Sequence, residues 1–382
     1  MDKPIRIALI AYNLNSTLSV GAQRVNYWAE QIVECASNIS CDVISAHLPS
    51  NPLNGIGKAH LVKHDSTSLL SMIINDQGIS WRKDLKTFFQ NEELKYDVIL
   101  LSGGPFMHFS LSKYLKERTG ARIILDFRDP FAVNPRFRSS YIRIKAKQFF
   151  EGAFIKDADQ VITVNSSCLK LLYGYSNATA AKFSVIPNGY NDVSLNLLNL
   201  DKRKQIAGKI QFVYPGKFYS DCSPNTFLNI ISKDNSEKFA FEYAGSSENE
   251  LGEFNSKSNI TINGRLPYTD VIRMVNNGDV GLIFTGGKSF ESTTKIYDYI
   301  GLEKSILIIT EGPKFTGELH EITRNYQSIY WSNNTESDIN QVLDRMLEVN
   351  LTFSNPLREE HSRKAGLMKL IGIIQKLAAS NG

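Results

Sequence analysis

Short runs of apolar residues alternate with longer amphipathic stretches along most of the chain. The first run, IRIALIAY at 5–12, precedes an amphipathic stretch at 22–37, and the same alternation continues through the first half. Apolar runs of this length are typical of parallel strands buried on both faces, and the amphipathic stretches between them predict helices. The strands predicted in the first half are 5–12, 41–48, 96–104, 121–129, 159–166 and 183–190.

The same rhythm resumes after a polar stretch at 191–209, which predicts a linker. The strands predicted in the second half are 210–218, 239–247, 259–267, 280–287 and 305–312. Two such series predict an α/β protein with two doubly wound, Rossmann-like domains that face each other across a cleft. The predicted boundaries are 1–195 for the first domain, 196–357 for the second, and 358–382 for a C-terminal helix.

Composition narrows the class of protein. The chain has 382 residues, of which 42% are hydrophobic and 21% charged, as in ordinary globular proteins. A net charge of +4 is far from the basic balance of nucleic-acid-binding proteins, so we expect no nucleic-acid partner. The 4 cysteines are scattered without metal-ligand spacing, and no apolar stretch is long enough to cross a bilayer. These features predict a cytoplasmic protein with reduced thiols and no bound metal.

Polar side chains follow several predicted strands of the second half, at the sheet edge where ligands of such folds bind. Gly216 and Lys217 follow the first strand, and Arg265 and Leu266 follow the third. A loop rich in glycine and hydroxyl groups follows the fourth strand and leads into a helix. Its residues Ser292, Thr293 and Thr294 suit a phosphate at the start of that helix, because backbone N–H groups are unpaired there.

One turn further along lies Asp298, whose carboxylate can accept hydrogen bonds from a sugar diol. Each of these assignments has a structural alternative. Lys217 and Arg265 can be solvated turn residues, and the hydroxyl residues can serve only as a helix cap. Asp298 can pair with Lys295, three residues before it, on an exposed face. We favour the binding interpretation because these residues converge on one edge of one predicted sheet.

The first half carries candidates of its own. Asp126, Arg128 and Asp129 end the strand ILDFRD, where they can meet a second substrate or simply hold a loop through an Arg–Asp pair. His108 lies among apolar residues and can be either a catalytic group or a satisfied core histidine. The pattern DAD at 157–159 resembles a metal-binding DxD, but its place between a helix and a strand predicts a solvated connection.

Basic and aromatic residues are interleaved between 134 and 156. The cations are Arg136, Arg138, Arg143, Lys145, Lys147 and Lys156, and the apolar residues among them are Ile142, Phe149, Phe150, Phe154 and Ile155. A basic helix with an apolar side is attracted to an anionic membrane surface. The alternative, which we favour from the sequence, is a domain helix that buries its aromatic residues in the core.

Over nearly its whole length the chain resembles retaining glycosyltransferases of family 4, which have the GT-B fold. KIYDYI at 295–300 resembles the K-L-F-E-Y-L helix that carries the second acid of the family's E-x7-E pattern. ILDFRDPF at 124–131 resembles the DFRDPW segment of a bacterial exopolysaccharide and lipopolysaccharide subgroup. Three further segments match that subgroup in order: SGGPFMHFSL at 102–111, VITVNSS at 161–167 with VIPNGYN at 185–191, and NGRLPY at 263–268.

The resemblance implies roles for the matching residues. Asp298 would hold the donor ribose, and Lys217 with the backbone near Thr293 and Thr294 would hold the diphosphate. Lys295 belongs to the same donor-binding set. Arg265 and Leu266 would border the base. Gly216 and Gly21 would allow close approach of the backbone to the donor, with Gly21 next to the transferred sugar. His108 and the acids Asp126 and Asp129, with Arg128 between them, would line the acceptor side.

Three departures from the family pattern matter. The first acid falls on Phe290, and Glu291 is one residue out of register, so either a shorter loop presents Glu291 or no acid contacts the donor sugar. The second acid, Asp298, is one methylene shorter than glutamate. The family's second basic residue has no match, because Asp221 and Cys222 stand there.

The function implied is transfer of a hexose from a nucleotide diphosphate sugar, UDP-linked, to a bacterial surface or exopolysaccharide glycan, free or lipid-linked. Lys217, Glu291 and His108 are the predicted catalytic residues. The reaction is expected to need no metal or organic cofactor, with peripheral contact at the inner membrane as an option. Two alternatives stay open, namely a UDP-sugar 2-epimerase-like GT-B enzyme and a catalytically silent subunit that binds nucleotides or glycans.

Overall fold

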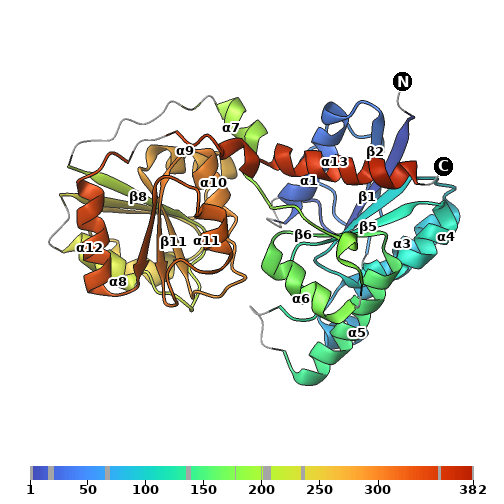
Figure 1. Cartoon of the computed structure of the whole chain (residues 1–382), viewed down its shortest axis with the longest axis horizontal. Helices are drawn as coiled ribbons and strands as arrows, with labels where there is room; N and C mark the ends of the chain where they lie inside the picture. Colours follow the sequence, from blue (N-terminus) through green and yellow to red (C-terminus); the bar gives the residue numbers. More distant parts are fainter. Residues whose placement is uncertain are drawn as a thin grey trace. The chain divides into compact units, whose positions relative to one another are not determined.

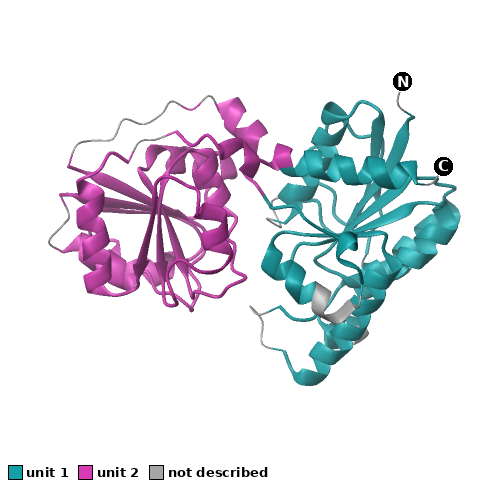
Figure 2. Ribbon diagram, in the orientation of Figure 1, with its two compact units in different colours: residues 1–188, 366–382 teal, residues 189–365 magenta. Residues whose placement is uncertain are grey.

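A parallel β-sheet forms the centre of each of the two units into which the chain divides (Figure 2). Unit 1 comprises residues 1–188 and 366–382, and unit 2 comprises 189–365. The computed structural model describes residues 3–15, 21–64, 69–134, 139–176, 178–198, 200, 208–233, 237–351 and 354–380, without the side chains of 69–70 and 173–176. The predicted cations Arg136 and Arg138 lie outside the described residues.

Unit 1 has a seven-stranded parallel sheet in the order β3-β2-β1-β4-β5-β6-β7 (Figure 1). The strands are β1 (Ile5–Ala11), β2 (Ile39–Ser45), β3 (Ala59–Leu61), β4 (Val98–Ser102), β5 (Arg122–Phe127), β6 (Gln160–Thr163) and β7 (Phe183–Val185). Six of the seven follow the predicted apolar runs. The seventh, β3, was missed because it is a three-residue edge strand with two exposed side chains, so it carries no apolar run.

Helices cover both faces of this sheet, as apolar strands without polar alternation require. They are α1 (Ala22–Cys35), α2 (Leu69–Ile74), α3 (Gly78–Asn91), α4 (Ser112–Thr119), α5 (Tyr141–Asp157), α6 (Ser166–Ser176) and the C-terminal α13 (Arg363–Ala379), with short 3₁₀ turns at η1 (Met107–Leu111) and η2 (Ala180–Lys182). Residues of α3, α4, α5 and α6 share one apolar core with alternate residues of the central strands.

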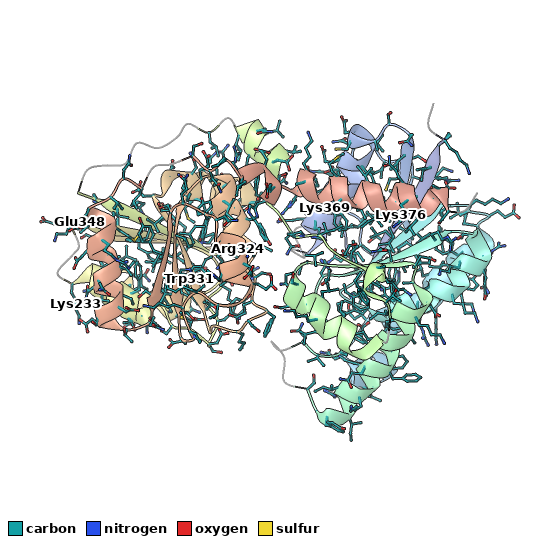
Figure 3. The ribbon with its side chains drawn as sticks, viewed as in Figure 1. Lys233, Arg324, Trp331, Glu348, Lys369 and Lys376 are labelled. Carbon is teal, nitrogen blue, oxygen red and sulfur yellow. The ribbon has the colours of Figure 1, made fainter. Side chains whose placement is uncertain are left out.

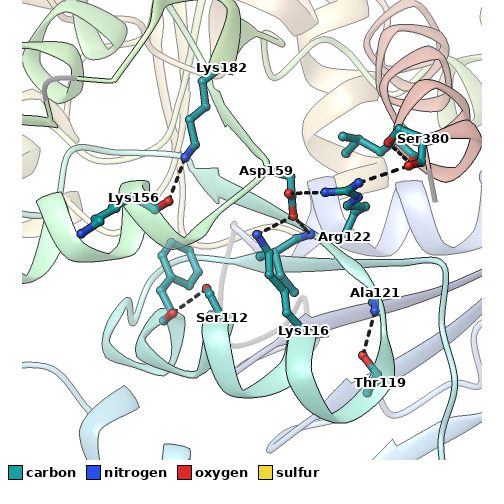
Figure 4. Close-up of polar contacts among 12 residues, drawn as sticks. Ser112, Lys116, Thr119, Ala121, Arg122, Lys156, Asp159, Lys182 and Ser380 are labelled. Carbon is teal, nitrogen blue, oxygen red and sulfur yellow. Dashed lines mark hydrogen bonds and ion pairs between the residues drawn. The ribbon is translucent and has the colours of Figure 1, made fainter.

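The C-terminal helix α13 returns to unit 1, as predicted. It buries the apolar side chains Leu367, Leu370, Ile371 and Ile374, while Lys369 and Lys376 lie on its exposed side (Figure 3). Arg122 of β5 donates a hydrogen bond of 3.2 Å to the carbonyl of Ser380, just after the helix ends (Figure 4). The helix begins at Arg363 rather than near 358, where a separate 3₁₀ turn, η4 (Arg358–His361), precedes it.

Unit 2 repeats the arrangement with six parallel strands in the order β10-β9-β8-β11-β12-β13. They are β8 (Ile210–Pro215), β9 (Phe239–Ala244), β10 (Ile260–Asn263), β11 (Val280–Thr285), β12 (Ser305–Thr310) and β13 (Ile329–Asn333). The predictions omitted β13, whose burial pattern mixes buried and half-buried residues. Along β8, Phe212 and Tyr214 pack on one face of the sheet and Val213 packs on the other.

The helices of unit 2 are α7 (Asp192–Leu198), α8 (Asn225–Ser232), α9 (Tyr268–Asn277), α10 (Lys295–Gly301), α11 (Gly317–Thr323) and α12 (Glu336–Leu347), with a 3₁₀ turn at η3 (Glu248–Phe254). Helix α7 corrects the prediction of a linker over 191–209. The polar start of that stretch is a helix cap, because the Asn191 carbonyl Oδ1 accepts from the backbone N–H of Ser194 at 3.1 Å, and Leu195 is buried.

Within the described residues, no helix is long and apolar enough to span a bilayer.

Candidate functional site

The strand order of unit 2 places its candidate residues at the point where the chain changes direction across the sheet. β8 and β11 are neighbours, and the connections that leave their carboxyl ends run to opposite sides, to β9 and β12. Ligands of open α/β sheets bind in the crevice at this switch point. The two loops that leave it meet, because Lys288 Nζ lies 3.4 Å from Asp221 Oδ2.

The Lys295 ammonium lies beside this switch point. Its Nζ is 3.5 Å from the centroid of the Tyr214 ring near the end of β8, and a Cβ built on Gly216 would lie 3.5 Å from the same atom. Gly216 has a φ of +114°, which residues with a side chain rarely adopt. Glycine therefore suits this position, and no side chain separates the loop backbone from the Lys295 ammonium. Burial lowers the pKa of Lys295 to about 7. An anion bound here would restore the favourable environment that burial has removed.

Asp298 lies one turn further along α10 and is half-buried. Its Oδ1 accepts a hydrogen bond of 2.9 Å from the Tyr268 hydroxyl at the start of α9. Burial raises the pKa of Asp298 to about 6. The positive charge of Arg363 and the hydrogen bond from Tyr268 both lower this pKa, but their effect is smaller than that of burial. The sequence also allowed Asp298 to pair with Lys295 on an exposed face. The structure does not have this pair, because the Lys295 ammonium lies over the Tyr214 ring.

Glu291 folds back onto the end of β11. Its Oε2 accepts a hydrogen bond from the Thr285 hydroxyl, and that hydroxyl oxygen accepts from the backbone N–H of Gly287 at 3.0 Å. Burial raises the pKa of Glu291, and the nearby Asp221 carboxylate raises it further. Two carboxyl groups from different strand-end loops therefore share the switch point with Lys288.

The other predicted residues of this edge are more exposed. Lys217, Arg265 and Leu266 have exposed side chains, and the Lys217 carbonyl accepts a hydrogen bond of 2.9 Å from the Tyr214 hydroxyl. Thr293 is half-buried, and Thr294 is exposed at the start of α10, where its hydroxyl makes no capping hydrogen bond. Their contacts with a donor remain predictions.

In unit 1, Asp126 is fully buried at the end of β5. Its Oδ2 accepts a hydrogen bond of 2.9 Å from the Ser102 hydroxyl, and its Oδ1 lies 3.6 Å from Nη2 of the buried Arg24. The Arg24 Nη1 also donates to the carbonyl of Pro187 at 2.8 Å. This network ties β4, β5, α1 and the segment after β7 together, which is a structural role; contact of Asp126 with an acceptor stays a prediction.

Arg128 makes its contacts within the strand-end loops rather than with an aspartate. Its guanidinium donates to the Gly103 carbonyl, with a distance of 3.0 Å from Nε. Gly21 and Gly104 both border this guanidinium, and a Cβ on Gly21 would overlap it. Any side chain at position 21 would therefore displace the Arg128 guanidinium, and the approach of Gly21 to a sugar stays a prediction. Asp129 is half-buried.

His108 lies in the core of unit 1 with no exposed surface. Its ring packs edge-on against Trp81 and Phe109, with centroids 5.2 and 5.0 Å away. Burial lowers the pKa of His108 to about 3, so the ring is neutral at physiological pH. Full burial places His108 in the core, as one of the two interpretations from the sequence has it, and the catalytic role plays no part in our proposal.

The DAD pattern at 157–159 belongs to an ion-pair network at the amino ends of the strands (Figure 4). Asp159 pairs with Lys116 at 2.9 Å and with Arg122 at 3.2 Å, and its Oδ2 also accepts from the backbone of Ile123. Asp159, the second acid of the pattern, is thus ion-paired at the amino ends of the strands, opposite to the carboxyl ends where the candidate residues of unit 1 lie.

Four residues of this arrangement were missed from the sequence: Tyr214, Tyr268, Thr285 and Arg24. Tyr214 lies one residue before the end of β8, and Thr285 ends β11. The order of these strands in the sheet was the signal that could have identified both residues. Tyr268 directly follows the Gly-Arg-Leu-Pro turn. Arg24 lies within an amphipathic helix, where a buried cation gives no signal in the sequence.

No protein-family model matches the sequence, and comparison with curated proteins finds no match. Solved structures do match over nearly the whole chain. A sucrose-phosphate synthase from Thermosynechococcus elongatus is 13% identical with a TM-score of 0.68, covering 98% of this chain and 100% of that one. HepE from Anabaena, solved with UDP and glucose, is 8% identical with a TM-score of 0.63, covering 97% and 99%. This chain has the GT-B fold.

A third neighbour is a putative UDP-N-acetylglucosamine 2-epimerase from Listeria monocytogenes. It is 10% identical with a TM-score of 0.60, covering 97% of this chain and 96% of that one. At these identities the GT-B similarity establishes the fold, and the predicted fold class is confirmed. Activity has to be argued from the residues of the site.

Proposed function

We propose that the protein is a glycosyltransferase that moves a hexose from a UDP-linked sugar to a bacterial surface or exopolysaccharide glycan, with retention at the anomeric carbon. The observation that carries the proposal is the Lys295 ammonium, held over Tyr214 and beside Gly216 at the switch point of unit 2. A diphosphate placed at Gly216 would meet this cation and the more exposed Lys217. Asp298, one turn away on the same helix, would then accept hydrogen bonds from the ribose hydroxyls.

Transfer of the sugar breaks the bond between its anomeric carbon and the diphosphate oxygen and forms a bond from that carbon to an acceptor hydroxyl oxygen, which gives up its proton. Negative charge therefore grows on the departing diphosphate oxygen. Positive groups already held in place stabilise such a charge without reorganisation. Lys295 and Lys217 would supply this charge from this chain's own residues, with the backbone at Thr293 and Thr294 as further donors. Arg265 and Leu266 would border the base. The proposal assigns no metal or organic cofactor to the reaction.

Glu291 is the residue that we assign to the transferred sugar. Its carboxyl group accepts a hydrogen bond from the Thr285 hydroxyl, so it lies at the carboxyl end of β11. A carboxylate in this position can accept hydrogen bonds from sugar hydroxyl groups. On the acceptor side we retain Asp126, Arg128 and Asp129 as candidates.

Donor hydrolysis in the absence of an acceptor tests this proposal. We expect slow release of free hexose from a panel of UDP-hexoses by the wild type, with Glu291→Gln and Lys295→Met both reducing the rate. The control is Lys257→Met, which removes an exposed lysine of unit 2 that precedes the amino end of β10, whereas the switch point lies at carboxyl ends of strands. A wild-type protein that binds UDP and hydrolyses no donor in the panel would contradict the assignment as a transferase.

A second candidate function is 2-epimerisation of a UDP-sugar. It is favoured by the carboxyl pair of Glu291 and Asp221, because an epimerase needs an acid and a base. Incubation with UDP-N-acetylglucosamine alone distinguishes the two. An epimerised sugar nucleotide would support the second candidate, and free N-acetylglucosamine would support the first.

A further inference from the structure

Helix α5 of unit 1 has two apolar faces. On one face Phe154 and Ile155 are buried in the core of the unit, together with the Glu151 carboxyl group. On the other face Ile142 is 80% exposed and Phe149 is 75% exposed, and Tyr141 at the helix start is 73% exposed. The expectation that this helix buries all its aromatic residues in the core is therefore only partly correct.

The exposed residues of α5 form one continuous stripe. Positions i, i+3, i+4, i+7, i+11 and i+14 share one side of a helix, and here they are all exposed: Ile142, Lys145, Ala146, Phe149, Ala153 and Lys156. Ile142 and Phe149 lie two turns apart, about 10 Å along the helix axis. Lysines flank them, and Lys145 Nζ lies 5.5 Å from the Tyr141 ring centroid.

The charge on this surface has one sign. Arg143, Lys145 and Lys156 are exposed, whereas the acids of α5 are the buried Glu151 and the half-buried Asp157. On the neighbouring α4, Lys113 and Glu117 lie 4.0 Å apart, so their charges offset each other. Within the described residues of α5, the exposed stripe thus combines large apolar side chains with positive charge, and no exposed acid of this helix offsets it.

We infer that this stripe is a docking surface for an anionic lipid bilayer. At the boundary between headgroups and acyl chains, the apolar side chains enter the hydrocarbon. The lysine ammonium groups and the arginine guanidinium group contact lipid phosphates. A protein partner fits less well, because lysine is depleted in the buried centres of protein interfaces. The inference is independent of the proposed glycosyl transfer.

The same helix is connected to the strand-end loop of unit 1. The Glu151 Oε2 accepts hydrogen bonds of 3.0 Å from the backbone N–H groups of Phe131 and Ala132, which follow the Asp126–Asp129 segment. Lys147 Nζ lies 4.9 Å from the Phe131 ring centroid. A bilayer bound to the exposed face would therefore lie against the helix that holds the candidate acceptor loop.

Cosedimentation of the full chain with vesicles tests the inference. We expect binding to vesicles of phosphatidylglycerol and phosphatidylcholine, little binding to phosphatidylcholine alone, and weakening as salt rises. Ile142→Gln with Phe149→Gln should weaken the partition coefficient about tenfold, and Arg143→Gln with Lys145→Gln by a similar factor. All four side chains are exposed, so the native fold should persist, as thermal melting would verify.

The matched control is Met72→Gln with Ile73→Gln on α2 of the same unit, where the side chains are 67% and 52% exposed. This variant should bind vesicles like the wild type. Absence of binding to anionic vesicles would overturn the inference, as would binding that neither α5 variant changes. Concentration-dependent dimerisation lost in the Ile142→Gln, Phe149→Gln variant, without vesicle binding, would show instead that a second copy covers this face.

Discussion

Replacement of Lys295 by methionine probes the diphosphate assignment through its dependence on pH. Burial lowers the pKa of Lys295 to about 7, so the free protein loses this positive charge as pH rises above neutrality. A bound diphosphate favours the protonated form and raises its pKa, so nucleotide affinity and protonation are linked. We therefore expect the affinity of the wild type for UDP to fall between pH 7 and pH 9.

The magnitude follows from the contacts of the ammonium. A hydrogen bond from a charged donor contributes about 1.5–3 kcal/mol. Moving Nζ from its place 3.5 Å above the Tyr214 ring centroid costs about 0.5–1 kcal/mol of cation–π attraction. The net contribution is about 1–2 kcal/mol when the lysine is protonated, so Lys295→Met should weaken UDP binding by up to about 5–30-fold at pH 7, the low end of the range. Near pH 9, where the wild-type lysine is mostly neutral, the two affinities should converge.

Calorimetric titration with UDP in matched buffers from pH 7 to pH 9 measures this dependence, since the last phosphate ionisation, near pH 6, is complete there. Lys295→Arg is the control, because arginine keeps its charge and should give a flat profile. A wild-type affinity that does not change over this range, or a constant ratio between wild type and Lys295→Met, would refute the assignment of Lys295 to the diphosphate.

Three further predictions concern the carboxyl groups of Asp298, Asp126 and Glu151. Burial raises the pKa of Asp298 to about 6, so the folded protein binds more protons there than the unfolded chain, and its stability falls as pH rises from about 4 to 6. Asp298→Asn should remove this pH dependence. In urea titration at pH 7, the variant should raise the free energy of unfolding of unit 2 by about 1–2 kcal/mol. Asp126→Ala leaves Arg24 buried without its carboxylate and should cost about 3–5 kcal/mol, and a double-mutant cycle with Arg24→Met that shows no coupling would contradict the ion pair. Glu151→Ala should cost about 2–4 kcal/mol, because two backbone N–H groups lose their acceptor, whereas Glu151→Gln, which keeps an oxygen, should cost less in the same assay.

The fold was accessible from the sequence because the strands buried on both faces form uninterrupted apolar runs. β12, SILIIT, is buried at every position, and such a run needs no knowledge of its neighbours to be recognised. β3 and β13 were missed because edge strands have fewer buried positions. The polar start of α7 suggested a linker because capping and linker residues have the same chemistry.

The candidate site was accessible only in part. Lys295 and Asp298 were identified by their place at a helix start, but their partners Tyr214 and Tyr268 depend on which strands and helices are neighbours in space. Lys217 looked like the main cation because it follows a strand and a glycine. In the structure its side chain is exposed, while the cation beside Gly216 comes from a helix far along the chain.

Binding of UDP to the Asp298→Ala variant tests the central claim most directly. If the switch point of unit 2 receives a nucleoside diphosphate with its ribose on Asp298, loss of this charged acceptor should weaken binding by about 1.5–3 kcal/mol, or roughly 10–150-fold, in calorimetry at pH 7.5. Asp270→Ala, which removes an exposed acid of α9 paired with Arg273, should bind UDP like the wild type. Wild-type affinity in a folded Asp298→Ala protein would contradict the ribose assignment and the site built around it.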